Sequence, residues 1–355
     1  MLGPLLPGLI ARWHIQDAQA GALFTSFFSG QLTGAYIAAR NLRASIVFGS
    51  LITAIGCIAM LWVNFHFAHV ALFAIGFGVG AGLTAGNVIA GTIVRSSSRL
   101  LAMINVGWSI GAIACPTLIR IFGARWFFVI TAVVITVAAL IASTVPTPQR
   151  VSSNDTVTPR LPLPIVPLLI FALVLLLYIG IENTLGGWLP SYAVRTSASL
   201  LASSISFYFW VAELMGRALA AAILQKLTDS LLYRVSLVLL IASVFLFVFI
   251  PSLSPIEITT LTILCGIAIA SLYPIIVASL LSRTGPHPRL GLLFASASLG
   301  GVTLPWLTGV FSTFFHSLRI GLIVPAVGGL LLLILSPVIA NRQAPAGPDS
   351  KIHTS

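Results

Sequence analysis

The chain has 355 residues, of which 58% are hydrophobic and only 7% are charged, and its mean hydropathy is +1.08. Soluble globular proteins carry a charge on about a quarter of their residues, so this composition excludes a soluble globule and indicates a polytopic membrane protein. The net charge of +11 does not indicate a nucleic-acid-binding protein, because the basic residues stand singly or in pairs between apolar runs.

Apolar runs follow one another along the chain, separated by short segments that contain Arg, His, Asn or Pro. The first run, residues 2–10, is about half as long as a full membrane span, which needs about 20 residues. Longer runs cover residues 18–39, 44–63, 69–94, 101–123, 126–145, 164–193, 200–224, 231–251, 256–282, 287–313 and 319–341. The sequence therefore predicts an all-α polytopic bundle of eleven full spans and one fragment, with a polar linker at 146–163 and a polar tail at 342–355.

The two halves of the chain repeat each other, which predicts two six-helix halves, residues 1–145 and 164–341. The repeated positions are Ser109, Gly111 and Pro116 with Ser298, Gly300 and Pro305, and Gly3, Leu6, Pro7 and Arg12 with Gly186, Leu189, Pro190 and Arg195. The second match aligns the first residues with the end of the span at 164–193, so the inner part of span one is missing. We favour a mis-assigned start over a shortened protein.

The basic residues also predict an orientation. Most of them fall in loops that share one side of the membrane with the linker and the tail, which places both termini in the cytoplasm and the protein in the plasma (inner) membrane. The opposite, outer side keeps Arg12, Arg120, Arg125, Arg195 and Arg319.

Twelve spans in two halves around a polar linker resemble the major facilitator superfamily. Short motifs are similar to its branch of fucose permeases and sodium-dependent glucose transporters: Tyr178-Ile-Gly-Ile-Glu182 with Gly186-Gly187-Trp188, Gly216-Arg217, and Ser298-Leu-Gly300-Gly with Leu304-Pro305. The resemblance implies a transporter that works by alternating access. It also implies a gating loop at Arg40 and Arg43, although the acidic residue and the glycine usual in that loop are absent. Leu83 stands where fucose permeases carry another acidic residue.

Glu182 is the strongest candidate site residue, because a carboxylate inside a membrane span is costly and usually marks an ion or substrate path. Tyr178 lies four residues earlier and shares its helix face. We expect residues 183–187, which include Asn183 and two glycines, to break the helix and expose backbone groups to a ligand in a transport cavity. The alternative is a structural carboxyl group that bonds to a neighbouring helix.

A second charged pair lies in the span at 200–224. Glu213 precedes Arg217 by four residues, which is the favourable order for an ion pair within one helix. The pair is either a structural ion pair or a switch in which Arg217 releases Glu213 when a proton or solute arrives.

Aromatic rings and amides complete the predicted site, because sugars present C–H faces to rings and hydroxyls to amides and carboxylates. The further candidates are Asn87, Asn105, Trp108, Asn183, Trp188 and Tyr208. The alternative roles are interface anchoring or packing for the aromatic residues and helix packing for the amides. We assign Gly78, Gly82 and Gly86 to helix packing alone.

These observations predict a secondary active transporter of a small polar solute, above all a sugar, coupled to a cation, above all H⁺. The alternatives are a drug or metabolite exporter of the same fold and a transport-inactive membrane sensor or partner protein. We expect no enzymatic activity, cofactor or metal, and we expect a monomer whose partners are solute, cation and the lipid bilayer.

Overall fold

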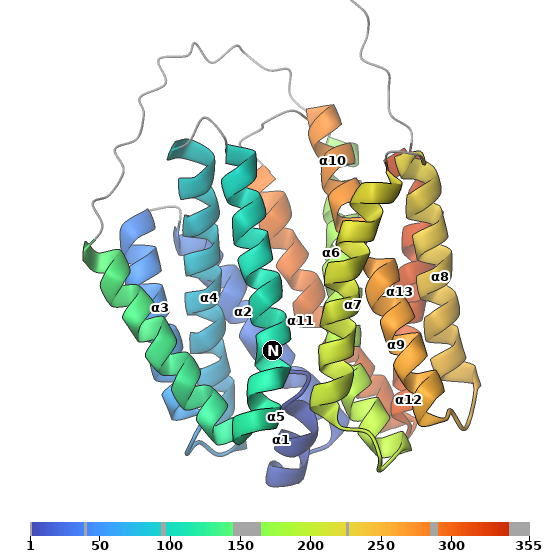
Figure 1. The fold of residues 1–355 in the computed structure, drawn as a ribbon, viewed down its shortest axis with the longest axis horizontal. Helices are drawn as coiled ribbons and strands as arrows, with labels where there is room; N and C mark the ends of the chain where they lie inside the picture. The colour runs from blue at the N-terminus through green and yellow to red at the C-terminus, as the bar shows by residue number, and fades with distance from the viewer. Residues whose placement is uncertain are drawn as a thin grey trace, which may run out of the picture.

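The computed structural model describes residues 2–38, 41–93, 97–144, 165–224, 227–284 and 290–340, and every regular element in these ranges is a helix (Figure 1). The helices are α1 (Leu6–Trp13), α2 (Asp17–Ala38), α3 (Leu42–Ala59), α4 (Phe65–Ile93), α5 (Ser97–Thr144), α6 (Ile165–Thr196), α7 (Ala202–Ile223), α8 (Asp229–Phe249), α9 (Pro255–Ala270), α10 (Leu272–Thr284), α11 (Leu290–Phe314), α12 (Leu318–Gly321), α13 (Ile323–Ile334) and α14 (Ser336–Ala340). Six helical segments of the described chain are long and apolar enough to cross a bilayer. Helices suit this setting because they satisfy their own backbone hydrogen bonds without water.

Glycine and proline decide where some helices bend. The runs predicted at 101–123 and 126–145 are two helical segments, both within α5, and they meet at a kink at Gly123, where φ is +77°. That conformation suits glycine because it has no Cβ. The run predicted at 256–282 is instead divided at Ser271 into α9 and α10. Pro274 explains this division, since proline is tolerated in the first turn of a helix but not in its interior.

The helices before residue 145 (the N-terminal half) and those after residue 164 (the C-terminal half) meet along three main contacts. α2 packs against α11, α5 against α7, and α1 against α6. Figure 1 shows α5 and α7 side by side. At the first contact the backbones approach closely, because a Cβ on Gly21 would come within 2.9 Å of the Cα of Trp306. The site described below is built on these contacts.

The prediction that Gly78, Gly82 and Gly86 all serve helix packing is partly wrong. A Cβ on Gly78 would come within 2.0 Å of the Gly49 carbonyl oxygen, so Gly78 does permit close packing of α4 against α3. A Cβ on Gly82 or Gly86 would meet no atom within 4 Å. A four-residue spacing places glycines on one face of a helix, but the tilt of the neighbouring helix decides which of them it touches.

The internal repeat supplies a test with a matched control. A Cβ on Gly300 would lie 1.9 Å from the Leu176 carbonyl oxygen, whereas one on Gly111, the repeat-related position, would meet nothing within 4 Å. We expect Gly300→Ala to cost about 1–3 kcal/mol, the usual range for overpacking, because α6 and α11 must separate. Gly111→Ala should leave stability unchanged or slightly raised. Thermal unfolding of the two purified variants measures the difference, and equal midpoints would show that the α6–α11 contact tolerates a methyl group.

Candidate functional site

α6 carries Tyr178 and Glu182 one turn apart, and both side chains are buried, with Glu182 only 5% exposed. The expected helix break at 183–187 is wrong: α6 continues to Thr196, and the Asn183 amide donates to the carbonyl oxygen of Ile179 within the helix at 2.8 Å. Most of this stretch is buried, and buried backbone groups must find partners, which an unbroken helix provides. In this conformation Glu182 therefore lies inside a packed interface and not on the wall of an open cavity.

α7 supplies the second charged pair. Glu213 is 1% exposed and forms an ion pair with Arg217 one turn later in the same helix. Arg217 also donates from Nη1 to the Ser109 hydroxyl at 3.2 Å, and its guanidinium lies 5.6 Å from the ring centre of Trp108. Because Ser109 and Trp108 belong to α5, Arg217 joins the C-terminal half to the N-terminal half.

The residues from α6 and α7 form one group, which we call the carboxylate cluster: Tyr178, Glu182, Glu213 and Arg217. Its two carboxyl groups interact with each other and with Arg217. A single guanidinium thus accompanies two buried acids, and charges held out of water are costly unless they are paired. The Tyr178 hydroxyl lies close to Glu182 and Arg217, but neither it nor Glu213 Oε2 makes a hydrogen bond of good geometry among the described residues. Such buried, unpaired polar atoms are uncommon and mark positions where a proton, water or ligand group would be accommodated.

Two aromatic residues border the cluster. The ring of Tyr273, from α10, lies 5.4 Å from that of Tyr178, centre to centre. On the α5 side, Trp108 meets Trp210 edge to face at 5.4 Å. Of the two, only Trp108 was predicted for the site. Tyr273 was not among the predicted residues, although a tyrosine inside an apolar span could have indicated it.

For the remaining predicted residues, a role in the site stays a prediction. Asn87, on α4, and Tyr208, on α7, are exposed. Arg43 donates to the Ser143 carbonyl oxygen, which ties the start of α3 to the end of α5 within one half. Arg40 and the side chain of Asn105 lie outside the described residues, so their predicted roles stay predictions.

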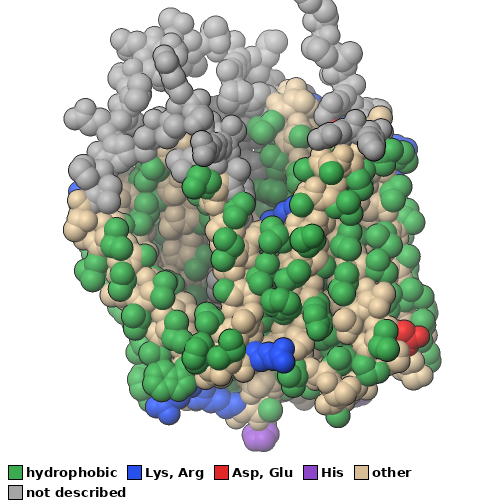
Figure 2. All heavy atoms as spheres, viewed as in Figure 1, with side chains coloured by type: hydrophobic (Ala, Val, Ile, Leu, Met, Phe, Trp, Pro, Cys, Tyr) green, Lys and Arg blue, Asp and Glu red, His purple; other side chains and the backbone are tan. Residues whose placement is uncertain are grey.

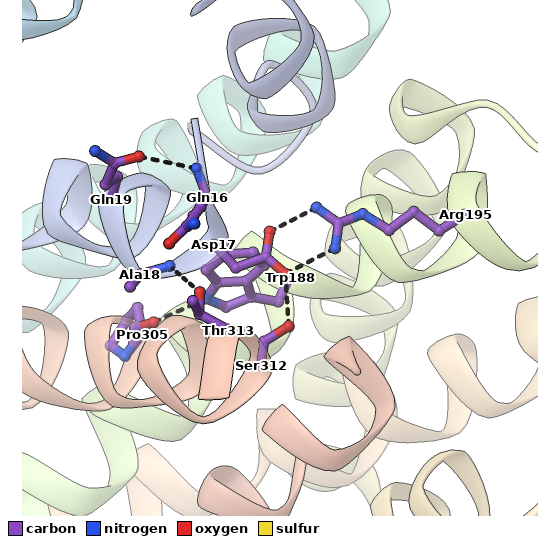
Figure 3. A network of polar contacts seen from close by, with 9 residues as sticks. All are labelled: Gln16, Asp17, Ala18, Gln19, Trp188, Arg195, Pro305, Ser312 and Thr313. Atoms are coloured by element: carbon purple, nitrogen blue, oxygen red, sulfur yellow. Dashed lines mark hydrogen bonds and ion pairs between the residues drawn. The ribbon is translucent and has the colours of Figure 1, made fainter. Parts of the chain in front are cut away.

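Trp188 and Asp17 belong to a second polar network at one end of the bundle (Figure 3). The two carboxylate oxygens of Asp17, at the start of α2, accept from Arg195 of α6 at 2.6 and 2.7 Å, and Oδ2 also accepts from the Ser312 hydroxyl of α11 at 2.5 Å. We call Asp17, Arg195 and Ser312 the latch, because they join the two halves. A polar cavity of about 300 Å³ lies beside them.

Two more bonds support the latch. The Ala18 backbone N–H donates to Thr313 Oγ1 at 2.8 Å, and Trp188 Nε1 donates to the Pro305 carbonyl oxygen at 2.9 Å. Trp188 is fully buried, so its interpretation as an interface anchor is wrong, and it lies in this network instead of beside the cluster. Asp17 was not predicted from the sequence. The sequence did offer an indication, because Asp17 is a carboxylate at the start of an apolar run, on the outer side of the membrane to which Arg195 was also assigned.

Comparison with known proteins gives a match to the family described as Major Facilitator Superfamily over residues 1–289. Among curated proteins, the chain is 23% identical to "Bypass of stop codon protein 6" of Saccharomyces cerevisiae, covering 88% of this chain and 73% of that protein. It is 25% identical to the "Glucose/mannose transporter GlcP" of Bacillus subtilis, covering 86% of this chain and 82% of the transporter.

Solved structures share the fold over nearly the whole chain. A bacterial homologue of the human lysosomal transporter Spinster, in an inward-facing and occupied conformation, matches with a TM-score of 0.74 at 16% identity, covering 97% of this chain and 94% of that one. The transporter FucP in its outward conformation matches with a TM-score of 0.62 at 17% identity and 96% coverage of both chains. The chain therefore has the same all-α fold as these solved transporters.

Proposed function

The chain belongs to the Major Facilitator Superfamily, and from this premise we propose that it moves a sugar across the membrane by alternating access, coupled to protons. The carboxylate cluster carries the proposal. It holds two carboxyl groups and one guanidinium out of water, where unpaired charges are costly and are retained for ion or solute handling. The sugar assignment rests on the resemblance to a glucose/mannose transporter together with the hydrogen-bonding and aromatic groups around Glu182.

In the proposed cycle, the net charge of the carboxylate cluster determines which contacts Arg217 makes. With one proton on the carboxyl pair, Arg217 balances the remaining negative charge and keeps its contacts with Ser109 and Trp108. Loss of that proton leaves two negative charges for one guanidinium, which draws Arg217 toward the carboxyl groups and weakens its hold on α5. Proton transfer would in this way change the contact between the two halves.

The latch completes the proposal at one end of the pathway. It joins α2 to α6 and α11, and alternating access requires such contacts to open as the other end closes. We place this end on the outer side of the plasma membrane, with both chain termini in the cytoplasm, as the distribution of basic residues predicts.

A proton-uptake assay tests the function directly. Weakly buffered, de-energised cells that express the chain are given a panel of sugars while the external pH is recorded. We expect one sugar to make the medium more alkaline, since symport carries protons inward, and we expect Glu182→Gln to abolish this signal because the amide binds no proton. Glu257→Gln makes the same chemical change at an exposed glutamate that caps the start of α9, so it is the matched control and should keep the signal. No pH change with any sugar, with the protein shown to be in the membrane, would refute sugar–proton symport.

A further inference from the structure

A larger cavity lies on the N-terminal half, at the same end of the bundle as the latch. Its volume is about 600 Å³, and the end of α1, the turn after α3 and the break in α5 at Gly123 form its wall. The lining residues used below are Leu9, Arg12, Met60, Trp62, Arg125 and Phe128. The interruption at Gly123 turns the chain away from its helical path and so helps to leave this space open.

The cavity combines apolar walls with two arginines. Arg12 makes one hydrogen bond, from Nη2 to the Leu61 carbonyl oxygen at 3.3 Å, and Arg125 makes no hydrogen bond or ion pair with any described residue. No aspartate or glutamate is among the residues that line the cavity. Because a guanidinium carries five N–H donors, most of the hydrogen-bonding capacity of the two side chains is unused within the described chain.

The position of the cavity matches the boundary between lipid and water. Trp62 is 71% exposed and Trp126, next to Arg125, is 59% exposed, and both lie close to helix ends or breaks. Exposed tryptophans at such positions are typical of the headgroup level of a membrane. Figure 2 shows arginine side chains along the lower edge of this half, below a surface rich in hydrophobic side chains.

We propose that this cavity binds an anionic phospholipid. The phosphate of the headgroup would lie between Arg12 and Arg125, since a guanidinium matches the geometry of a phosphate and forms paired hydrogen bonds with it. The first part of an acyl chain would pack on Leu9, Met60 and Phe128, and the rest would extend into the bilayer. The excess of positive charge without a carboxylate in the wall favours a net negative headgroup over a zwitterionic one.

Lipid titration of the purified full-length chain tests the proposal, with bound lipid counted by native mass spectrometry. We expect dioleoyl phosphatidylglycerol to bind more tightly than dioleoyl phosphatidylcholine. The double variant R12Q/R125Q should lose roughly 30-fold in affinity for the anionic lipid, since each arginine near the surface contributes roughly a factor of five. R120Q removes an exposed arginine of α5 that does not line the cavity, and it should bind within about twofold of the parent, as expected where no contact to the phosphate is lost.

A second measurement does not depend on the arginine variants folding. Phosphatidylglycerol with brominated acyl chains should quench part of the tryptophan fluorescence of the parent chain, and Trp62→Phe should remove that part. Equal binding of the two lipids, an equal loss in R120Q, or quenching that is unchanged in Trp62→Phe would overturn the proposal. Displacement of the lipid by an equal concentration of inorganic phosphate would also overturn it, because it would identify a site for a free anion.

Discussion

Arg217→Gln is expected to destabilise the protein by about 3–5 kcal/mol and to abolish coupled transport, because it leaves the Glu213 carboxylate buried without its partner. The variant also loses the hydrogen bond to Ser109 and the contact with the Trp108 ring, both of which cross between the halves. Thermal unfolding of the purified protein measures the first effect, and the external-pH assay with the sugar that responds measures the second.

Two control variants distinguish the effect of leaving Glu213 unpaired from the effect of removing any arginine. E213Q/R217Q removes both members of the ion pair, so it should be more stable than Arg217→Gln alone, since no unpaired charge is left from that pair. Arg195→Gln breaks the other ion pair in the described chain, in which Arg195 is 42% exposed, and should cost only about 1 kcal/mol. If Arg217→Gln unfolded at the same temperature as the parent, the guanidinium would not be balancing buried charge and the proposed coupling would fail.

A disulfide across the latch is expected to stop transport completely and reversibly. Ala18 and Thr313 lie on opposite halves and touch, with the Ala18 nitrogen 2.8 Å from Thr313 Oγ1, so cysteines at these two positions put one thiol on each side of the closed latch. The three native cysteines are buried and do not compete. A partly exposed ion pair such as Asp17–Arg195 is worth about 1 kcal/mol and opens readily, whereas a disulfide does not open during transport.

The experiment compares solute uptake by Ala18→Cys/Thr313→Cys before oxidation, after oxidation and after reduction. We expect loss of uptake only in the oxidised protein and recovery with a reductant. Each single cysteine variant should transport in all three conditions. The mass of the oxidised protein shows whether it is cross-linked. If the cross-linked protein took up solute as fast as the protein with its disulfide reduced, this end of the bundle would stay closed throughout the cycle, and the latch would be a static contact.

These two experiments fail independently of each other. The disulfide tests whether the halves must separate at the latch, and it needs no assumption about the coupling ion. The Arg217 variants test the charge balance of the cluster, and their stability can be measured without any solute. Inhibition by the disulfide together with silent proton measurements would support alternating access with a different coupling ion or none.

The sequence predicted the features that depend on short stretches of chain. Composition and the length of the apolar runs were sufficient for an all-helical membrane protein, because twenty apolar residues in lipid have little alternative to a helix. The Glu213–Arg217 ion pair was also predictable, since both residues lie on one helix and a four-residue spacing brings them together. The four-residue spacing likewise predicted that Tyr178 and Glu182 share one face of a helix.

Tertiary structure decided the features that join distant parts of the chain. Asp17 and Arg195 are 178 positions apart, and nothing in either local sequence predicts their bond. The helix across residues 183–187 stays intact because neighbouring helices bury it, although its glycines by themselves favour a break. Likewise, Gly300 is packed while Gly111 is open, although the repeat makes them equivalent in sequence. Local sequence determines which segments form helices, whereas the packing of helices from the two halves determines which residues meet.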